Sequence, residues 1–359
     1  MSDGWIGVTG LMRLAIAGDL LPHERAVLER GDSGEIVSIA SAHGVLPLLA
    51  HAAEHPACQD LLEPDLAEFF NVMRANNITR NRMLRDHLVD IGNALARAGI
   101  EGVVLKGGNE LLTPMYPQGG RFIGDLDILV GPEHIDTAWE IFHQLGYVSR
   151  GDRDDPALHH HLPALQHTTT YVSVELHRRL ATGRGDKVVP ARLVLETSQP
   201  SSLAGLRVPA DWVRLLHVVV HAQNGAPAGV PHDIRLRDLS EIQLIAHQLE
   251  DDDRLRARDQ ATAGGMQLEF DGMLEISLDL LATPCAKSPE VAAWVGRAVS
   301  TLGVPEIRRR NYIRERLSYY LGKIFSDAEA RRRYIGHLLR PAYVLKAMRQ
   351  HRAEFHNIR

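Results

Sequence analysis

The chain has 359 residues, 45% of them hydrophobic and 24% charged, with a formal net charge of −5. This length allows two or three domains with packed cores. The two cysteines, Cys58 and Cys285, lie far apart, which excludes a disulfide scaffold and a cysteine-based zinc site and favours a reducing, cytoplasmic compartment. The first residues have no basic start and no run of about 18 apolar residues occurs, so neither a signal peptide nor a transmembrane segment is expected.

The charge is unevenly distributed along the chain. Residues 305–359 contain 14 Lys or Arg and 5 Asp or Glu, so this tail is strongly basic and the rest is acidic. A basic tail could bind nucleic acid, a membrane surface or acidic parts of its own chain. Because the chain as a whole is acidic, a long groove that follows a nucleic-acid backbone is not favoured. We expect the tail to be solvated or to pack on the body of the protein.

The predicted elements begin with a helical region, residues 1–98. The last helix of this region carries apolar residues at helical spacing and is expected to end at Gly99. These apolar positions are Leu84, Leu88, Ile91 and Leu95.

A strand-rich region, residues 99–200, follows. Its first strand is short and apolar, ends at Leu105, and leads through Lys106, Gly107 and Gly108 into a short predicted helix. Glycine lets backbone N–H groups approach a phosphate, and a helix N-terminus carries partial positive charge, so this turn could bind an anion. The alternative is an ordinary strand-to-helix turn.

The next predicted strand, residues 125–130, contains two aspartates. Side chains on a strand point to opposite faces in turn, so Asp125 and Asp127 share one face. Two carboxylates this close repel each other, and a divalent cation such as Mg²⁺ would remove that repulsion. The pair therefore indicates a metal platform for phosphoryl or nucleotidyl transfer, with two solvated aspartates on an edge strand as the alternative. The opposite face is expected to be buried and carries Leu126, Ile128 and Val130.

A helix over residues 132–145 and a strand over residues 147–149 precede a third alternating strand, residues 167–177. Its polar face includes Glu175, which could complete a two-metal cluster or act as general base on an acceptor hydroxyl. A solvent-facing glutamate at a sheet edge is the alternative. His177 lies on the same face and could touch a substrate phosphate or orient Glu175. A direct role is less expected for the histidine run at 159–161.

Helical patterning returns at residue 209 and persists to the end, with loops at 224–233 and 263–265. His217 and His221 share one helix face, as zinc ligands sometimes do. No third ligand is evident, so we expect ordinary helix histidines.

Three motifs in order carry a resemblance to a known family: Lys-Gly-Gly at 106–108, Asp-Leu-Asp-Ile-Leu-Val at 125–130 and Val-Glu-Leu-His at 174–177. This order resembles the polymerase-β-like nucleotidyltransferase superfamily and, more narrowly, the bacterial "uncharacterised nucleotidyltransferase" family. One departure is the spacing, since the sixteen residues between the glycines and the first aspartate are more than is usual in the superfamily.

The resemblance assigns roles to the residues of these motifs. Gly107 and Gly108 would form the phosphate loop, while Asp125, Asp127 and Glu175 would hold two Mg²⁺ ions. From their charge alone, Lys106 and Arg121 could each add a cation that binds a triphosphate. The helix around Asp238 would line the cleft, although Asp238 could simply pair with a neighbouring arginine.

The sequence thus predicts an α+β protein, in which a small mixed β-sheet nucleotidyltransferase core (residues 99–200) lies between helical regions 1–98 and 201–359. As a hypothesis, it moves a nucleoside monophosphate from an NTP such as ATP to an acceptor nucleophile on a small molecule, peptide or protein and releases pyrophosphate. The competing hypothesis is a catalytically degenerate module that binds nucleotide or a partner and regulates something else.

Overall fold

The computed structural model describes residues 2–30, 32–58, 60–149, 161–224, 228–232, 234–280 and 288–301. Several predicted features lie outside these residues: His159, His160, Cys285 and the basic tail at 305–359.

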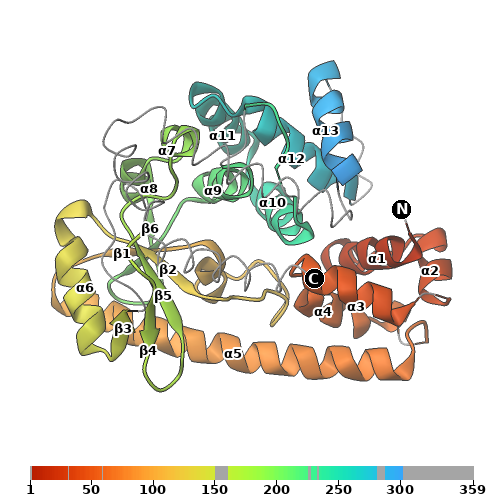
Figure 1. Cartoon of the computed structure of the whole chain (residues 1–359), viewed down its shortest axis with the longest axis horizontal. Helices are drawn as coiled ribbons and strands as arrows, with labels where there is room; N and C mark the ends of the chain where they lie inside the picture. The colour runs from red at the N-terminus through yellow and green to blue at the C-terminus, as the bar shows by residue number, and fades with distance from the viewer. Residues whose placement is uncertain are drawn as a thin grey trace, which may run out of the picture.

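The first hundred residues are helical, as predicted (Figure 1). Four short helices form a cluster, and a long helix, α5 (Pro64–Arg97), runs from this cluster beneath the sheet along most of the molecule. At 1.5 Å per residue, its 34 residues span about 50 Å. The short helices are α1 (Asp3–Ala17), α2 (Pro22–Leu28), α3 (Ser33–Ala42) and α4 (Leu46–Ala53), followed by the 3₁₀ turn η1 (Pro56–Cys58).

The predicted apolar stripe of α5 is fully buried, and the chain leaves the helix through Gly99 at a φ of 69°. A residue with a side chain is strained at this φ, which explains the glycine.

The described residues form a seven-stranded mixed sheet at the centre of the molecule, in the order β3-β4-β5-β2-β1-β7-β6. The pairs β2·β5 and β1·β7 are parallel and the other pairs are antiparallel. The sheet and its flanking helices confirm the predicted α+β class. The strands are β1 (Gly102–Leu105), β2 (Leu126–Leu129), β3 (Tyr147–Ser149), β4 (Leu165–His167), β5 (Ser173–His177), β6 (Gln199–Pro200) and β7 (Leu206–Val208).

Apolar side chains fill both faces of the central strands. Leu126 and Ile128 pack with α5 and with α6 (Ile135–Gln144), whereas Leu129 faces the opposite core. That opposite core contains apolar side chains of α9 (Asp211–Gln223) and α10 (Leu236–Gln248). The alternation of the sequence therefore places Asp127 on the side of the sheet that the C-terminal helices cover.

Two predicted elements differ from the structure. The strand predicted over 167–177 is a hairpin, in which β4 ends at His167, a turn follows, and Tyr171 adopts a φ of 59° before β5 begins. The threonines of this turn favour strands by composition, but the left-handed residue reverses the chain. The short helix predicted after Gly108 is a six-residue 3₁₀ helix, η2 (Lys106–Leu111).

Helices return after the sheet, as predicted, although β7 extends the sheet beyond residue 200. Among the described residues, no helix combines the length and apolar character needed to cross a bilayer. The remaining elements are the 3₁₀ turn η3 (Pro132–His134), α7 (Arg184–Val188), α8 (Ala191–Thr197), α11 (Asp251–Ala263), α12 (Gln267–Leu280) and α13 (Pro289–Thr301).

Candidate active site

Two of the three predicted acidic residues are direct neighbours in the sheet. In the parallel pair β2·β5, Asp127 is the register partner of Glu175. Since the residues on either side of Asp127 point into the opposite core, both carboxylates lie on the face toward the C-terminal helices. Asp125 lies just before β2 and is half-buried. The sheet therefore brings two acids together in register and places the third two residues away.

Asp127 is buried and accepts two short hydrogen bonds. Lys106 Nζ and His177 Nε2 each donate to Asp127 Oδ1 at 2.7 Å, and the aspartate side chain is only 2% exposed. Lys106 is the first residue of η2 and has a left-handed φ of 49°, which is uncommon for a residue with a side chain. From this backbone position the Lys106 side chain extends to Asp127 on the neighbouring strand β2.

His177 links the two acidic residues from the end of β5. Its Nε2 atom lies 3.5 Å from Glu175 Oε2 as well as 2.7 Å from Asp127, and its Nδ1 atom lies 3.3 Å from the carbonyl oxygen of Arg179. Both ring nitrogens face acceptors, so the geometry fits an imidazolium that carries both protons. Burial opposes this charge, but the hydrogen bonds to Asp127 and Glu175 outweigh burial and raise the pKa of His177. The ring is fully buried, a position that suits orientation of the carboxylates better than contact with a phosphate.

The three acids differ in how their charge is compensated. Burial alone would raise the pKa of Asp127, but Lys106 and His177 hold it far below its ordinary value. Glu175 behaves in the same way, because hydrogen bonding to His177 and the nearby His161 lower its pKa against the effect of burial. For Asp125, burial and the charges of Asp127 and Glu175 raise the pKa to about 6. Asp125 is thus the acid whose negative charge is least compensated.

The carboxylate oxygens of the site fit a metal ion. One oxygen each of Asp127 and Glu175 and one ring nitrogen of His177 lie within 4.8 Å of one another. Because an imidazolium has no free lone pair, the two carboxylates are the available ligands and His177 is not. Asp125 lies outside this group, and burial together with repulsion from Asp127 and Glu175 raises its pKa. A divalent cation would relieve that repulsion, and carboxylate oxygens are suitable ligands for Mg²⁺.

A cavity of about 260 Å³ opens beside the aspartates. The sheet, η2 and the segment before β2 form one wall, and α9 and α10 form the other. Its lining consists of Lys106, Gly107, Asn109, Arg121, Phe122, Ile123, Gly124, Asp125, Asp127, Arg214, His217, Val218, His221, Arg237, Asp238 and Glu241.

The segment before β2 is held by side chains of α5. Asn77 Nδ2 donates to the carbonyl oxygens of Gly119 and Arg121, at 2.8 and 2.9 Å. Arg80 donates to the carbonyl oxygens of Ile123 and Gly124, both at 2.8 Å. These bonds fix the backbone that leads into Asp125, and they give the unusually long segment between the glycines and the aspartates a defined path.

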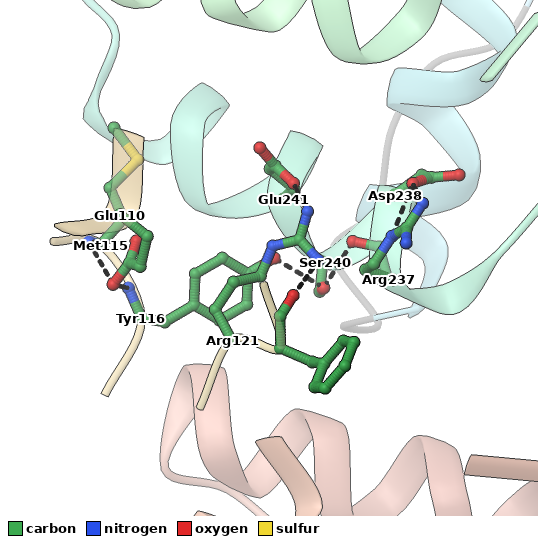
Figure 2. A network of polar contacts seen from close by, with 9 residues as sticks. Glu110, Met115, Tyr116, Arg121, Arg237, Asp238, Ser240 and Glu241 are labelled. Atoms are coloured by element: carbon green, nitrogen blue, oxygen red, sulfur yellow. Dashed lines mark hydrogen bonds and ion pairs between the residues drawn. The ribbon is translucent and has the colours of Figure 1, made fainter. Parts of the chain in front are cut away.

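Arg121, a predicted triphosphate ligand, lines the cavity but is already paired. Its Nη2 atom donates to Glu241 Oε2 of α10 at 2.6 Å, and both side chains are less than a tenth exposed. Figure 2 shows this pair beside a second link to α10, the hydrogen bond between Tyr116 and Ser240 at 3.0 Å. The structure thus gives Arg121 a structural contact that joins the segment before β2 to the C-terminal helices, and contact with a triphosphate stays a prediction.

The two glycines of the predicted phosphate loop have different surroundings. Gly107 lines the cavity, and a Cβ atom there would have ordinary contacts, the nearest at 3.6 Å to Ile123. Gly108 is buried, and a Cβ atom would lie 2.7 Å from Val104 Cγ1. Close packing therefore explains Gly108, whereas only Gly107 is placed where its backbone could face a phosphate.

Part of the helix wall was not predicted from the sequence. Arg214, His217 and His221 recur at helical spacing along α9, a polar stripe on an otherwise apolar helix that could have indicated a cavity wall. His217 Nε2 is buried without a hydrogen-bond partner among the described residues, and burial with nearby Lys106 keeps its pKa well below the ordinary value. Burial likewise lowers the pKa of His221 to about 4, so both histidines favour the neutral form. Neither belongs to a metal-binding group in the described residues.

On α10, Asp238 lines the cavity, as the resemblance implied, and also pairs with Arg237 at 3.2 Å. Glu241, one turn further along the helix, also lines the cavity, and no pattern in the sequence indicated this.

Comparison with known protein families identifies the family of this chain. A family model described as "uncharacterised nucleotidyltransferase" matches residues 29–281, about seven tenths of the chain, so the protein belongs to this nucleotidyltransferase family. None of the curated proteins compared with the chain matches it.

Proposed function

We propose that this protein moves a nucleoside monophosphate from an NTP to an acceptor nucleophile and releases pyrophosphate. The observation that supports this best is the register of Asp127 and Glu175 on adjacent parallel strands. Asp125 and Asp127 line the cavity, and Glu175 lies behind Asp127 in the sheet, outside that lining. Membership of the family supports nucleotidyl transfer in general. The acceptor in this proposal is a small molecule, a peptide or a protein.

Asp125, Asp127 and Glu175 would hold Mg²⁺, with two ions in the proposed site. The metal would supply activation of the attacking oxygen and neutralisation of the charge on the leaving pyrophosphate. The raised pKa of Asp125 supports this assignment, because a carboxylate crowded by two others gains most from a bound cation.

Residues of the chain would accept the proton, bind the phosphates and position the carboxylates. The acceptor oxygen forms a bond to the α-phosphorus, the bond from that phosphorus to the pyrophosphate oxygen breaks, and Glu175 takes the acceptor proton. Lys106 pairs with Asp127, and it would exchange this partner for a phosphate oxygen once a cation neutralises the aspartate. His177 is a positioning residue, because it bonds to Asp127 and approaches Glu175 without facing the cavity.

The alternative, a nucleotide-binding module without catalysis, is favoured by one observation. Asp127 is neutralised by Lys106 and His177 with no metal ion needed, so the fold itself does not require a cation there.

Turnover separates the two functions. The protein is incubated with each labelled NTP, with and without Mg²⁺, and pyrophosphate is measured together with the intact mass of candidate peptide acceptors. A transferase releases pyrophosphate only with the metal and adds the mass of one nucleotide to its acceptor. Glu175→Gln should abolish both signals, whereas Asp271→Asn, which breaks an exposed ion pair with Arg258, should change neither. Nucleotide binding without any release would favour the regulatory module.

A further inference from the structure

One large apolar side chain at the cavity is exposed. Phe122 lines the cavity, and 46% of its surface is accessible. Of the seven large hydrophobic side chains that are exposed in the described part of the chain, it is the one in the cavity lining. An exposed apolar surface beside a polar cavity is a feature of ligand sites.

The ring of Phe122 is held in a defined place. Arg80 on α5 donates to the carbonyl oxygens of Ile123 and Gly124, the two residues that follow, at 2.8 Å. The same guanidinium lies over the Phe122 ring, with its central carbon 5.2 Å from the ring centroid. A cation–π contact of this kind restrains the ring. The aromatic surface at the cavity is therefore presented by a fixed backbone.

Phe122 lies close to the aspartates along the chain. Phe122 precedes Asp125 by three residues, and three residues of chain reach at most about 10 Å. This is the scale of the distance from an α-phosphate, across the ribose, to the base. The cavity, at about 260 Å³, is smaller than the roughly 300–1,000 Å³ of pockets that enclose drug-sized ligands. A nucleoside triphosphate whose phosphates lie at the aspartates would therefore extend its base to the mouth of the cavity.

We propose that Phe122 stacks on the base of the nucleotide substrate, an inference that rests on the proposed function of the site. Stacking does not depend on the hydrogen-bonding edge of the base, so all four bases are accepted. A purine covers more of the ring than a pyrimidine does, so purine nucleoside triphosphates are the preferred substrate class. Phe122 thus determines the preference for the base, while the carboxylates determine the chemistry at the α-phosphate.

The test compares two ligands that differ in the base. Binding of α,β-methylene-ATP with Mg²⁺ and of inorganic tripolyphosphate with Mg²⁺ is measured by calorimetry for the full chain. Phe122→Ala should weaken binding of the nucleotide analogue roughly 5- to 150-fold and leave tripolyphosphate binding unchanged. Phe122→Trp should retain the affinity for the analogue, whereas Phe122→Leu, which is apolar but cannot stack, should lose it. The control Leu255→Ala removes another exposed apolar side chain, on α11 and outside the cavity lining, and should change neither ligand.

The outcomes separate this inference from the proposed function. If the wild-type protein binds both ligands and Phe122→Ala weakens both equally or neither, stacking is overturned while the transferase site stands. If the wild-type protein binds neither ligand, the proposed nucleotide site fails and the stacking proposal fails with it. The purine preference gives a further check, since the ratio of ATP to CTP affinity should fall toward one in Phe122→Ala.

Discussion

Two buried ion pairs lie at the same cavity, and their surroundings differ. The Arg121–Glu241 pair is closed, because both side chains are less than a tenth exposed. The Lys106–Asp127 pair is open, because Lys106 is 23% exposed and Glu175 and Asp125 lie beside it. The closed pair joins two parts of the fold. The open pair lies beside uncompensated negative charge, so Lys106 can change partners when a ligand binds.

The largest expected effect concerns the open pair. Asp127→Asn removes the charge that the proposed metal and both cationic neighbours require, so the rate of pyrophosphate release should fall at least about a thousandfold. The assay is Mg²⁺-dependent pyrophosphate release, with circular dichroism as the check on folding. Asp271→Asn is the matched control. A turnover within tenfold of wild type would show that Asp127 takes no part in the chemistry. The Lys106–Asp127 pair would then be structural, like the Arg121–Glu241 pair.

The closed pair should respond in stability instead. Arg121→Met leaves Glu241 buried without its partner, which should lower the free energy of unfolding by about 3–5 kcal/mol. The double variant Arg121→Met, Glu241→Leu removes both charges and should recover most of this loss. Urea denaturation of the three proteins measures it.

The nucleotide affinity of the double variant tests whether Arg121 also binds the triphosphate. An unchanged affinity for Mg²⁺·NTP would confine Arg121 to a structural contact, and a tenfold loss would restore the triphosphate role that the sequence predicted.

The two glycines of η2 give a smaller contrast. Gly108→Ala forces a Cβ atom against Val104 and should cost about 1–3 kcal/mol of stability, whereas Gly107→Ala should stay within about 0.5 kcal/mol. Thermal unfolding measures both. Equal stability losses would show that Gly107 is packed as tightly as Gly108 and cannot serve as a phosphate contact.

The smallest effect concerns the pH dependence of the segment beside the closed pair. Glu110 accepts backbone N–H bonds from Met115 and Tyr116 (Figure 2), yet burial outweighs these bonds and raises its pKa from 4.5 to about 7. Between these pH values the folded protein holds a proton that the unfolded chain has released. The free energy of unfolding therefore falls as the pH rises from 4.5 to 7, by about 1–2 kcal/mol once partial solvent access is considered.

Glu110→Gln cannot ionise and should remove this part of the pH dependence. Urea denaturation at pH 4.5, 6 and 7.5 measures the difference between variant and wild type. A constant difference across these values would show that Glu110 ionises normally in the folded protein.

The elements that the sequence predicted well are those with a strong local pattern. The strand around Asp127 and the stripe on α5 follow from periods of two and 3.6 residues, and both are buried as expected. The hairpin at 167–177 was missed because its turn is made of β-branched residues and depends on the left-handed backbone of Tyr171. The contact between Arg121 and Glu241 joins residues 120 positions apart, and no local pattern encodes such a pairing.

The candidate site follows the same division. The acids were predicted from alternation on two strands, whereas the cavity beside Asp125 and Asp127 is closed by helices that come later in the chain. Nothing near His177 in the sequence indicates that its ring is fully buried, because its contact with Asp127 joins residues 50 positions apart. The contact of the Phe122 ring with Arg80 of α5 likewise joins distant parts of the sequence.

The hydrogen bonds from α5 to the segment before β2 determine which sequence changes this segment can tolerate. Asn77, Arg80 and Asn81 bond to main-chain oxygens, not to side chains, so they recognise the path of the segment regardless of its residue types. The exposed side chain of Phe122 can therefore be exchanged, and the proposed base preference changed, without loss of these bonds. An insertion or deletion of one residue would break the match to the helix and shift Asp125 along the cavity. The length of this segment is therefore constrained even where a side chain is free to vary.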